Sequence, residues 1–123
     1  MLGKFVLWLS AILFIGYGLA CLVAPGLPAG YAGLALNNGD ALAEIGAMYG
    51  GLQTGFGVFC LLGALRVAYF RPALLLLSVC IGALALARSY WAFAADGVIT
   101  GYTYGAMVYE YATAILAALA LRR

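Results

Sequence analysis

Three ionisable side chains interrupt long apolar stretches of this 123-residue chain: Glu44, Arg88 and Glu110. A charged group at membrane depth costs about 3 kcal/mol or more, so it usually faces a partner or a cavity. An arginine fork can hold one or two carboxylates through charge-assisted hydrogen bonds. We therefore expect these three residues to form one buried polar cluster, which either binds a ligand or fixes the helices.

The depth of these residues supports a single cluster. At about 1.5 Å per residue, Glu44 lies roughly 5 Å, Arg88 roughly 10 Å and Glu110 roughly 9 Å from the outer helix ends. Two acids and one base leave a formal charge of minus one, which requires a proton on one carboxyl, a bound cation or contact with water. An ion-pair network that only fixes helix register is an equal alternative. If the cluster is a site, reversible protonation of Glu44 or Glu110 would couple binding to pH.

Other polar side chains lie near the acids along the chain. Tyr49 and Tyr109 are each close to an acid, so their hydroxyls either complete the cluster and donate to a bound anion or carbonyl, or simply pack in the core. Gln53 is near mid-span and should hydrogen-bond to Tyr17 or to another helix, in a structural role. The remaining aromatic residues of the outer rim are expected to anchor the protein at the membrane interface: Tyr90, Trp91, Tyr102 and Tyr104.

The composition defines the class of protein. With 67% hydrophobic and 8% charged residues, the chain cannot cover the surface of a water-soluble domain, so we expect an integral membrane protein. A net charge of +2 gives no argument for nucleic acid. Without histidine or a paired cysteine motif, we expect no metal and no cofactor. Cys21, Cys60 and Cys80 are expected to be buried structural thiols.

Four stretches are long enough to span about 30 Å of hydrocarbon as helices. They predict one all-α domain over residues 1–123, a membrane four-helix bundle with spans at about 5–24, 41–65, 72–95 and 104–121. The first stretch follows Lys4 and resembles a signal peptide, but its length predicts a retained span. Pro72 is expected in the first turn of the third span and Asp40 as the N-cap of the second. Residues 25–40 are expected to form an interfacial helix or an ordered loop.

The charged residues predict the orientation of the bundle. Basic residues stay in the cytoplasm during insertion. They flank the spans at one end, whereas Asp40 and Asp96 mark the other end, so we expect both termini in the cytoplasm. The basic residues are Lys4, Arg66, Arg71, Arg122 and Arg123.

The second span carries glycines on two faces of one helix. At about 100° per residue, Gly51 and Gly55 share a face with Glu44, and the opposite face holds the other glycines together with Gln53. Both faces have the spacing that allows close helix crossing. We expect one face to pack inside the bundle and the other against a bundle helix or a second subunit. The glycines of the opposite face are Gly46, Gly50 and Gly57.

The segment from Glu44 to Gln53 resembles the signature block of a family of small bacterial four-span proteins, catalogued as domain of unknown function 4345. It carries the pattern Glu-x-x-Ala-Met-Tyr-Gly-Gly-Leu-Gln. The four-span layout is also similar to DoxX-like proteins. The resemblance implies a multi-pass protein of the bacterial inner membrane and supplies no catalytic residues. Members of the family often have Arg where this chain has Gly46, so pairing of Glu44 with Arg88 becomes more important.

Two functions are compatible with these residues. The first is a module that binds or helps to transport a small ligand, lipid headgroup or cation in a pocket around the polar cluster. The second is a structural subunit that forms a homo-oligomer or joins a membrane complex through the glycine face of the second span, so that leucine at Gly50 or Gly57 would break the oligomer and spare the monomer. The sequence contains no recognisable nucleophile, set of metal ligands or cofactor motif, so we do not expect an enzyme.

Overall fold

The computed structural model describes all 123 residues and is helical throughout its spans, without strands. Two of the four long helices contain a π-helical segment, labelled η1 and η2. The elements in chain order are α1 (Leu2–Val23), α2 (Gly26–Ala32), α3 (Gly39–Ile45), η1 (Gly46–Leu52), α4 (Gln53–Leu65), α5 (Val67–Leu76), η2 (Leu77–Ile81), α6 (Gly82–Ala94) and α7 (Gly101–Arg122).

Four helices are long and apolar enough to cross a membrane. They are Leu2–Val23, Gly39–Leu65, Val67–Ala94 and Gly101–Arg122. A helix pairs its backbone N–H and C=O groups within itself, and a segment that crosses hydrocarbon needs this pairing because no water is available there. The predicted all-α membrane bundle is confirmed, and each expected span overlaps one of these helices.

Two expected helix starts are wrong. The third long helix begins at Val67, so Pro72 is the sixth residue of α5 and not part of its first turn. The second long helix is capped by Asn38, whose side-chain oxygen accepts a 2.9 Å hydrogen bond from the Ala41 N–H. Asp40 lies one residue inside that helix, where its charge still favours the positive end of the helix dipole.

The segment from residue 25 to residue 40 contains a short helix. α2 begins after Pro25 and ends at Ala32, and the next residue, Gly33, has a φ of 72°, which is left-handed and suits glycine. Pro28 and Ala29 are buried, whereas Leu34 is exposed. Of the two alternatives for this segment, the structure therefore shows a helix followed by an extended connection to α3.

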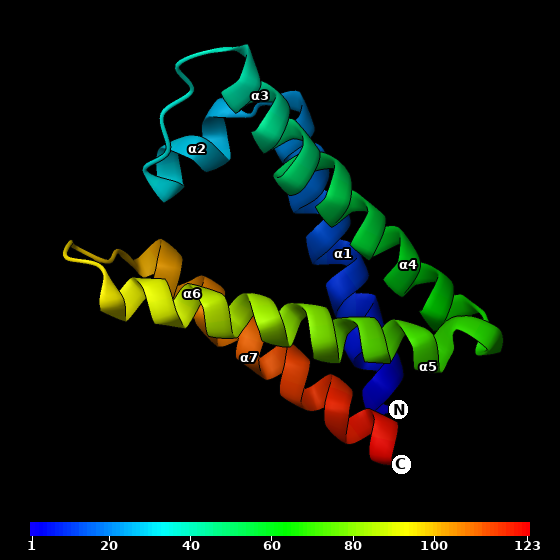
Figure 1. Ribbon diagram of the computed structural model, residues 1–123. Coiled ribbons are helices and arrows are strands. Elements are labelled where there is room, and N and C mark those ends of the chain that lie inside the picture. The colour runs from blue at the N-terminus through cyan, green and yellow to red at the C-terminus, as the bar shows by residue number, and fades with distance from the viewer.

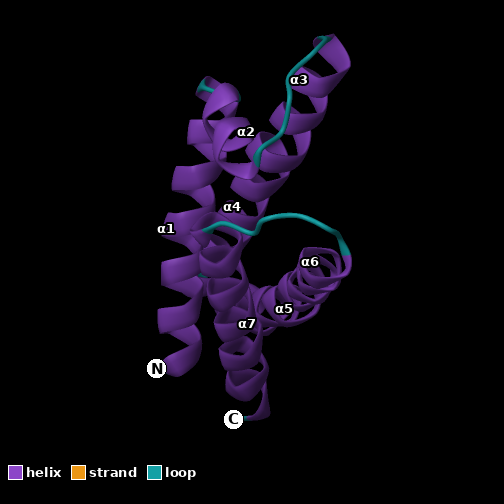
Figure 2. Ribbon diagram, turned by 90° about the vertical axis from the view of Figure 1, so that its left-hand side faces the viewer, coloured by secondary structure: helices purple, strands orange, loops and turns teal.

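The long helices form a wedge (Figure 1). One arm is α1 lying against η1 and α4, and the other is the helix α5–η2–α6 packed against α7. The arms meet near both termini and the α4–α5 connection, and they diverge toward α2, α3 and the α6–α7 connection. Figure 2 shows the same arrangement with α5 and α6 seen nearly end-on. The helices therefore share a core at the narrow end and separate at the wide end.

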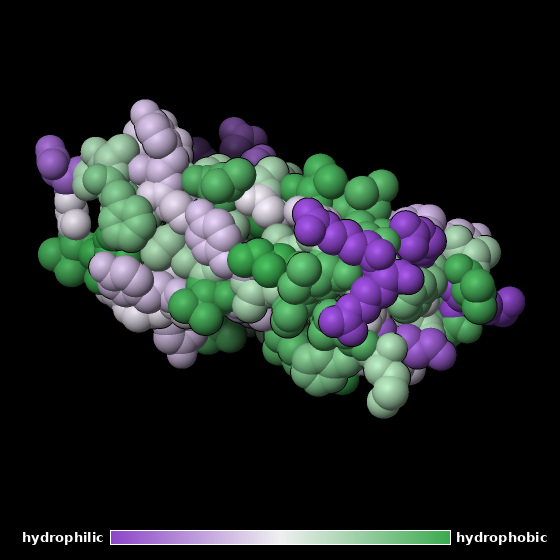
Figure 3. Space-filling view, turned by 90° about the horizontal axis from the view of Figure 1, so that it is seen from below, coloured by the Kyte–Doolittle hydropathy of each residue, from purple (hydrophilic) through white to green (hydrophobic).

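The narrow end is also the basic end. Hydrophilic side chains gather there in the view from below (Figure 3), and the five basic residues outside the polar pair are all exposed. Arg71 donates a 3.0 Å hydrogen bond from Nη2 to the backbone oxygen of Leu121, which ties α5 to the end of α7. Both termini and the connection at residue 66 thus lie at the same end of the bundle.

The shared core fills the narrow half of the wedge. Leu7, Cys60, Leu74 and Leu77 are completely buried there, and they come from α1, α4, α5 and η2. Small residues of α7, including Ala117, complete the cluster. No comparable core joins the arms at the wide end, so space remains between them.

Glycine contacts identify which face of the second long helix packs inside the bundle. A Cβ added at Gly57 would lie 2.7 Å from the Ile15 backbone nitrogen, and one at Gly50 would lie 2.6 Å from Cγ of Leu22. Both contacts are with α1. The expectation that leucine at Gly50 or Gly57 spares the monomer is therefore wrong, because these glycines hold the monomer together. Gly46 and Gly55 meet nothing within 4 Å, and Gly51 meets only its own helix.

Replacement of Gly57 by alanine should destabilise the protein, because the added methyl group would overlap the backbone of α1. Overpacking of this kind costs about 1–3 kcal/mol. Gly55→Ala is the matched control, since it adds the same methyl group two residues away in open space. Thermal unfolding in detergent should give a lower Tm for Gly57→Ala only. Equal Tm values for both variants would contradict the packing described for α1 and α4.

Candidate functional site

Arg88 of α6 and Glu110 of α7 form the central polar pair of the wedge. Nε of Arg88 donates to both carboxylate oxygens of Glu110 at 3.0 Å, and Nη2 donates to Oε1 at 2.8 Å. This contact is the fork geometry that makes arginine–carboxylate pairs strong and directional. Glu110 is 4% exposed, whereas the Arg88 side chain keeps 23% of its surface accessible. One nitrogen of the guanidinium, Nη1, has no partner in the protein.

The local sequence explains why the pair meets. α6 and α7 are joined by a short connection and run in opposite directions, so residues at similar distances from that connection face each other. Arg88 is six residues from the end of α6 and Glu110 nine residues from the start of α7, which places them about 9 Å and about 13 Å from the helix ends. Ser89 and Tyr111 add a second polar link, with their hydroxyls 2.8 Å apart.

Glu44 does not join this pair, so the predicted cluster of three charges is wrong. Glu44 is exposed on α3 and forms no ion pair. Glu44 lines neither cavity, and the wide end of the wedge separates α3 from α6 (Figure 1). The polar centre is thus one acid and one base with a formal charge of zero. Because the pair is neutral, it requires neither an additional proton nor a bound cation.

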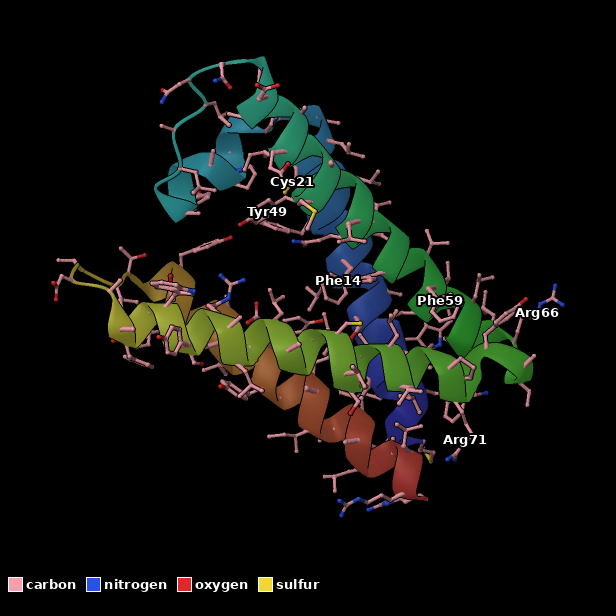
Figure 4. The ribbon with its side chains drawn as sticks, viewed as in Figure 1. Phe14, Cys21, Tyr49, Phe59, Arg66 and Arg71 are labelled. Carbon is pink, nitrogen blue, oxygen red and sulfur yellow. The ribbon has the colours of Figure 1, made fainter.

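Two cavities meet at Arg88. The first has a volume of about 490 Å³ and the second about 470 Å³. Both are lined mainly by hydrophobic side chains. They share five residues and thus form one cleft between the arms: Phe14, Tyr49, Gln53, Leu84 and Arg88. Figure 4 shows Phe14 and Tyr49 reaching into this space from α1 and η1.

Tyr49 and Gln53 offer unpaired polar groups to the cleft. Each lines both cavities, and neither side chain forms a hydrogen bond with another residue. The expected hydrogen bond from Gln53 to Tyr17 or to another helix is not formed, and the Tyr17 hydroxyl pairs with that of Tyr102. Since η1 is a π-helical segment, its side chains are rotated relative to an uninterrupted α-helix, and such segments are frequent at functional sites. The cleft therefore holds a phenol, an amide and a guanidinium with free donors.

Tyr109 has a different role. Its hydroxyl donates to Oγ of Ser10 on α1 at 3.3 Å, and its ring packs edge-to-face with Phe14 at a centroid distance of 6.0 Å. Of the two alternatives for Tyr109, the structure favours core packing. It contributes an aromatic wall to the first cavity and does not complete the Arg88 pair.

Two tyrosines that the sequence assigned to other roles close one side of the cleft. The hydroxyls of Tyr17 on α1 and Tyr102 on α7 lie 2.9 Å apart, and the Tyr102 ring stacks with Tyr31 of α2 at a centroid distance of 6.4 Å. Tyr102 was expected to be a membrane anchor. Its position at the start of an i, i+3, i+4, i+7, i+8 pattern ending at Glu110 was the signal for a cavity-facing residue. The pattern consists of Tyr102, Gly105, Ala106, Tyr109 and Glu110.

The small residues around Glu110 divide between packing and lining. Thr113, Ala114 and Ala117 are buried where α7 contacts η2, so they allow close helix approach. Ala106 lines the first cavity beside the acid. The small residues of α7 therefore line the cavity on the N-terminal side of Glu110 and allow close helix packing on its C-terminal side.

The acids and thiols of the chain are spread apart. No three histidine, cysteine, aspartate or glutamate side chains gather where they could hold a metal ion. Cys21 and Cys60 are buried free thiols, and Cys80 is half-buried beside the second cavity. The chemistry available in the cleft is thus hydrogen-bond donation from Arg88, Tyr49 and Gln53 within an apolar enclosure.

Removal of one partner of the Arg88–Glu110 pair should destabilise the protein by about 2–3 kcal/mol, because a buried charge loses its counter-charge. We expect a lower Tm in detergent for Glu110→Gln. The double variant Arg88→Met with Glu110→Leu should recover most of the loss, since no charge is left unpaired. Glu44→Gln is the control and should leave Tm unchanged. Additive effects in the double variant would show that the two side chains do not interact.

Comparison with known proteins gives one relationship. No curated protein and no solved structure matches the chain. The model of a family described as a domain of unknown function (DUF4345) matches residues 2–121. This range includes all four long helices and both members of the polar pair. The chain therefore belongs to the DUF4345 family.

Proposed function

We propose that this protein is a binding module that holds a small ligand or lipid headgroup against Arg88 in the cleft of the wedge. The observation that carries the proposal is the partly accessible guanidinium, which lines a cavity of about 490 Å³ and whose Nη1 has no partner in the protein. Ligand pockets are typically apolar enclosures of this size with a few convergent polar groups. The proposal assigns no catalysis, because the cleft supplies donors and lacks an activated nucleophile.

The charge of the cleft favours a hydrogen-bond acceptor over a cation. Glu110 already receives three hydrogen bonds from Arg88, so its charge is used inside the protein. Tyr49 and Gln53 line the same cavity as the guanidinium, from the opposite arm of the wedge. An acceptor such as a carbonyl or hydroxyl oxygen can bind all three. Of the ligands considered from the sequence, a small ligand or a lipid headgroup is thus preferred.

The proposed setting is the bacterial plasma membrane with both termini in the cytoplasm. Five exposed basic residues gather at the narrow end, and basic ends of membrane bundles remain cytoplasmic. The wide end and the cleft then face the outer leaflet.

Native mass spectrometry of the purified protein tests this function. Wild-type protein should retain a copurifying small molecule, and Arg88→Gln should lose it. Because Arg88→Gln also disturbs the ion pair, Tyr49→Phe and Gln53→Leu serve as variants that leave the pair intact. Loss of one hydrogen bond to the ligand should weaken binding by about fivefold to tenfold. Glu44→Gln is the matched control outside the cleft. Retention of the same molecules by all three cleft variants would refute the proposal.

An assembly subunit remains the second candidate, through a different surface. The open face of the second long helix carries Gly51, Gly55 and the exposed Glu44. Small residues let a neighbouring helix approach closely, and a charged group facing lipid gains from a polar partner.

If this face joins subunits, Gly55→Leu should reduce the oligomeric mass in native mass spectrometry without lowering Tm. Leu86→Ala is the control, because Leu86 is 65% exposed on another helix. An unchanged mass for Gly55→Leu, or a monomeric wild type, would count against assembly through this face.

A further inference from the structure

The two cavities share their polar donors and differ in the side chains that each adds along the wedge. The first, nearer the wide end, contains Glu110, Tyr17 and Tyr102 in addition to the shared donors. The second extends from Arg88 toward the middle of the spans and adds apolar side chains and one thiol: Met48, Leu52, Phe56, Cys80, Ile81 and Ala83. The unpaired donors therefore lie where the two cavities meet, and every side chain that the second cavity adds beyond them is apolar or a thiol.

The second cavity extends over similar lengths of the two arms. Seven residues separate Tyr49 from Phe56 along η1 and α4, and seven separate Ile81 from Arg88 along η2 and α6. Each interval corresponds to about 10 Å at 1.5 Å per residue. A lipid of the outer leaflet has the same arrangement, with its headgroup at the rim and its chain directed toward the midplane. The cleft runs parallel to such a lipid.

The cleft is closed on one side and accessible on the other. Between α1 and α7, the Tyr17–Tyr102 hydrogen bond and the stacked Tyr31 ring join the arms. Between η1 and α6, the rim of the second cavity is formed by exposed residues, among them Met48, Leu52 and Ala83. α6 packs mainly against α7 and η2. A chain can thus enter sideways from the surrounding hydrocarbon between η1 and α6.

The headgroup is defined by the charge at the polar end. Arg88 is the only basic side chain lining either cavity, and Glu110 neutralises it. An anionic headgroup would meet an equal negative charge beside the guanidinium. An uncharged headgroup with ester or hydroxyl oxygens accepts hydrogen bonds from Nη1, Tyr49 and Gln53 without that repulsion.

We infer that the ligand is an uncharged single-chain glycerolipid or a lipid of the same chemistry, which enters from the outer leaflet between η1 and α6. Its acceptor headgroup lies at Arg88 and its hydrocarbon chain fills the second cavity. This inference rests on the proposed binding function and specifies its ligand and its route of access.

The test uses the full-length protein in detergent, titrated with monomyristoyl glycerol and followed by native mass spectrometry. Ala83→Phe places a ring at the mouth of the apolar cavity and should weaken binding by about tenfold or more. Leu86→Phe is the matched control, because it adds a ring at an exposed position of the same helix outside both cavities. It should bind like the wild type.

Two ligand controls separate the parts of the inference. Lysophosphatidylglycerol with the same chain should bind about tenfold more weakly than monomyristoyl glycerol, and tighter binding would overturn the uncharged headgroup. Glycerol monoacetate carries the acceptor groups without the chain and should bind weakly to every variant. If Ala83→Phe binds monomyristoyl glycerol as tightly as wild type while Tyr49→Phe weakens it, the chain site is refuted and the proposed function stands. If neither variant weakens binding, both are refuted.

Discussion

The ion pair between Arg88 and Glu110 is the interaction on which the wide half of this protein depends. It allows two charges to lie within membrane-spanning helices, because each satisfies the other through directional hydrogen bonds. It also holds α6 to α7, so that these two helices stay together where the second arm diverges from α1 and α3. With the charges neutralised, the space that opens between the arms can be largely apolar and still contain a free guanidinium nitrogen.

The wedge follows from an unequal distribution of side chains along the helices. At the narrow end, Leu7, Leu74 and Leu77 interlock with the small residues of α4 and α7. Along α1, glycines permit backbone contact with the second long helix, and a single methyl group at Gly57 would disturb it. At the wide end, bulky aromatic residues replace these contacts, and a Tyr17–Tyr102 hydrogen bond joins the arms on one side only. The cleft is thus the consequence of a core that ends halfway along the spans.

The two π-helical segments belong to this same region. η1 contributes Tyr49 to the cleft, and η2 contributes Ile81 and Cys80 to the apolar part. A π-helical turn inserts one extra residue and shifts the side chains that follow, which changes the register of one helix face without breaking the helix. The donors that face the cleft are therefore placed by local backbone geometry as well as by helix packing.

The sequence by itself determined the class of fold, because four apolar stretches of spanning length can satisfy their backbones only as helices. It also identified Arg88 and Glu110, since an isolated charge in such a stretch needs a partner. It did not determine the partner: Glu44 has the right type and depth, but only the tertiary structure shows that it is exposed and lines neither cavity beside Arg88. Only the tertiary structure likewise shows that Gly57 packs against α1, that Tyr102 lines a cavity and that a cleft separates the arms. Periodicity limits which residues share a face, whereas the direction of each face depends on contacts between helices that are distant in the chain.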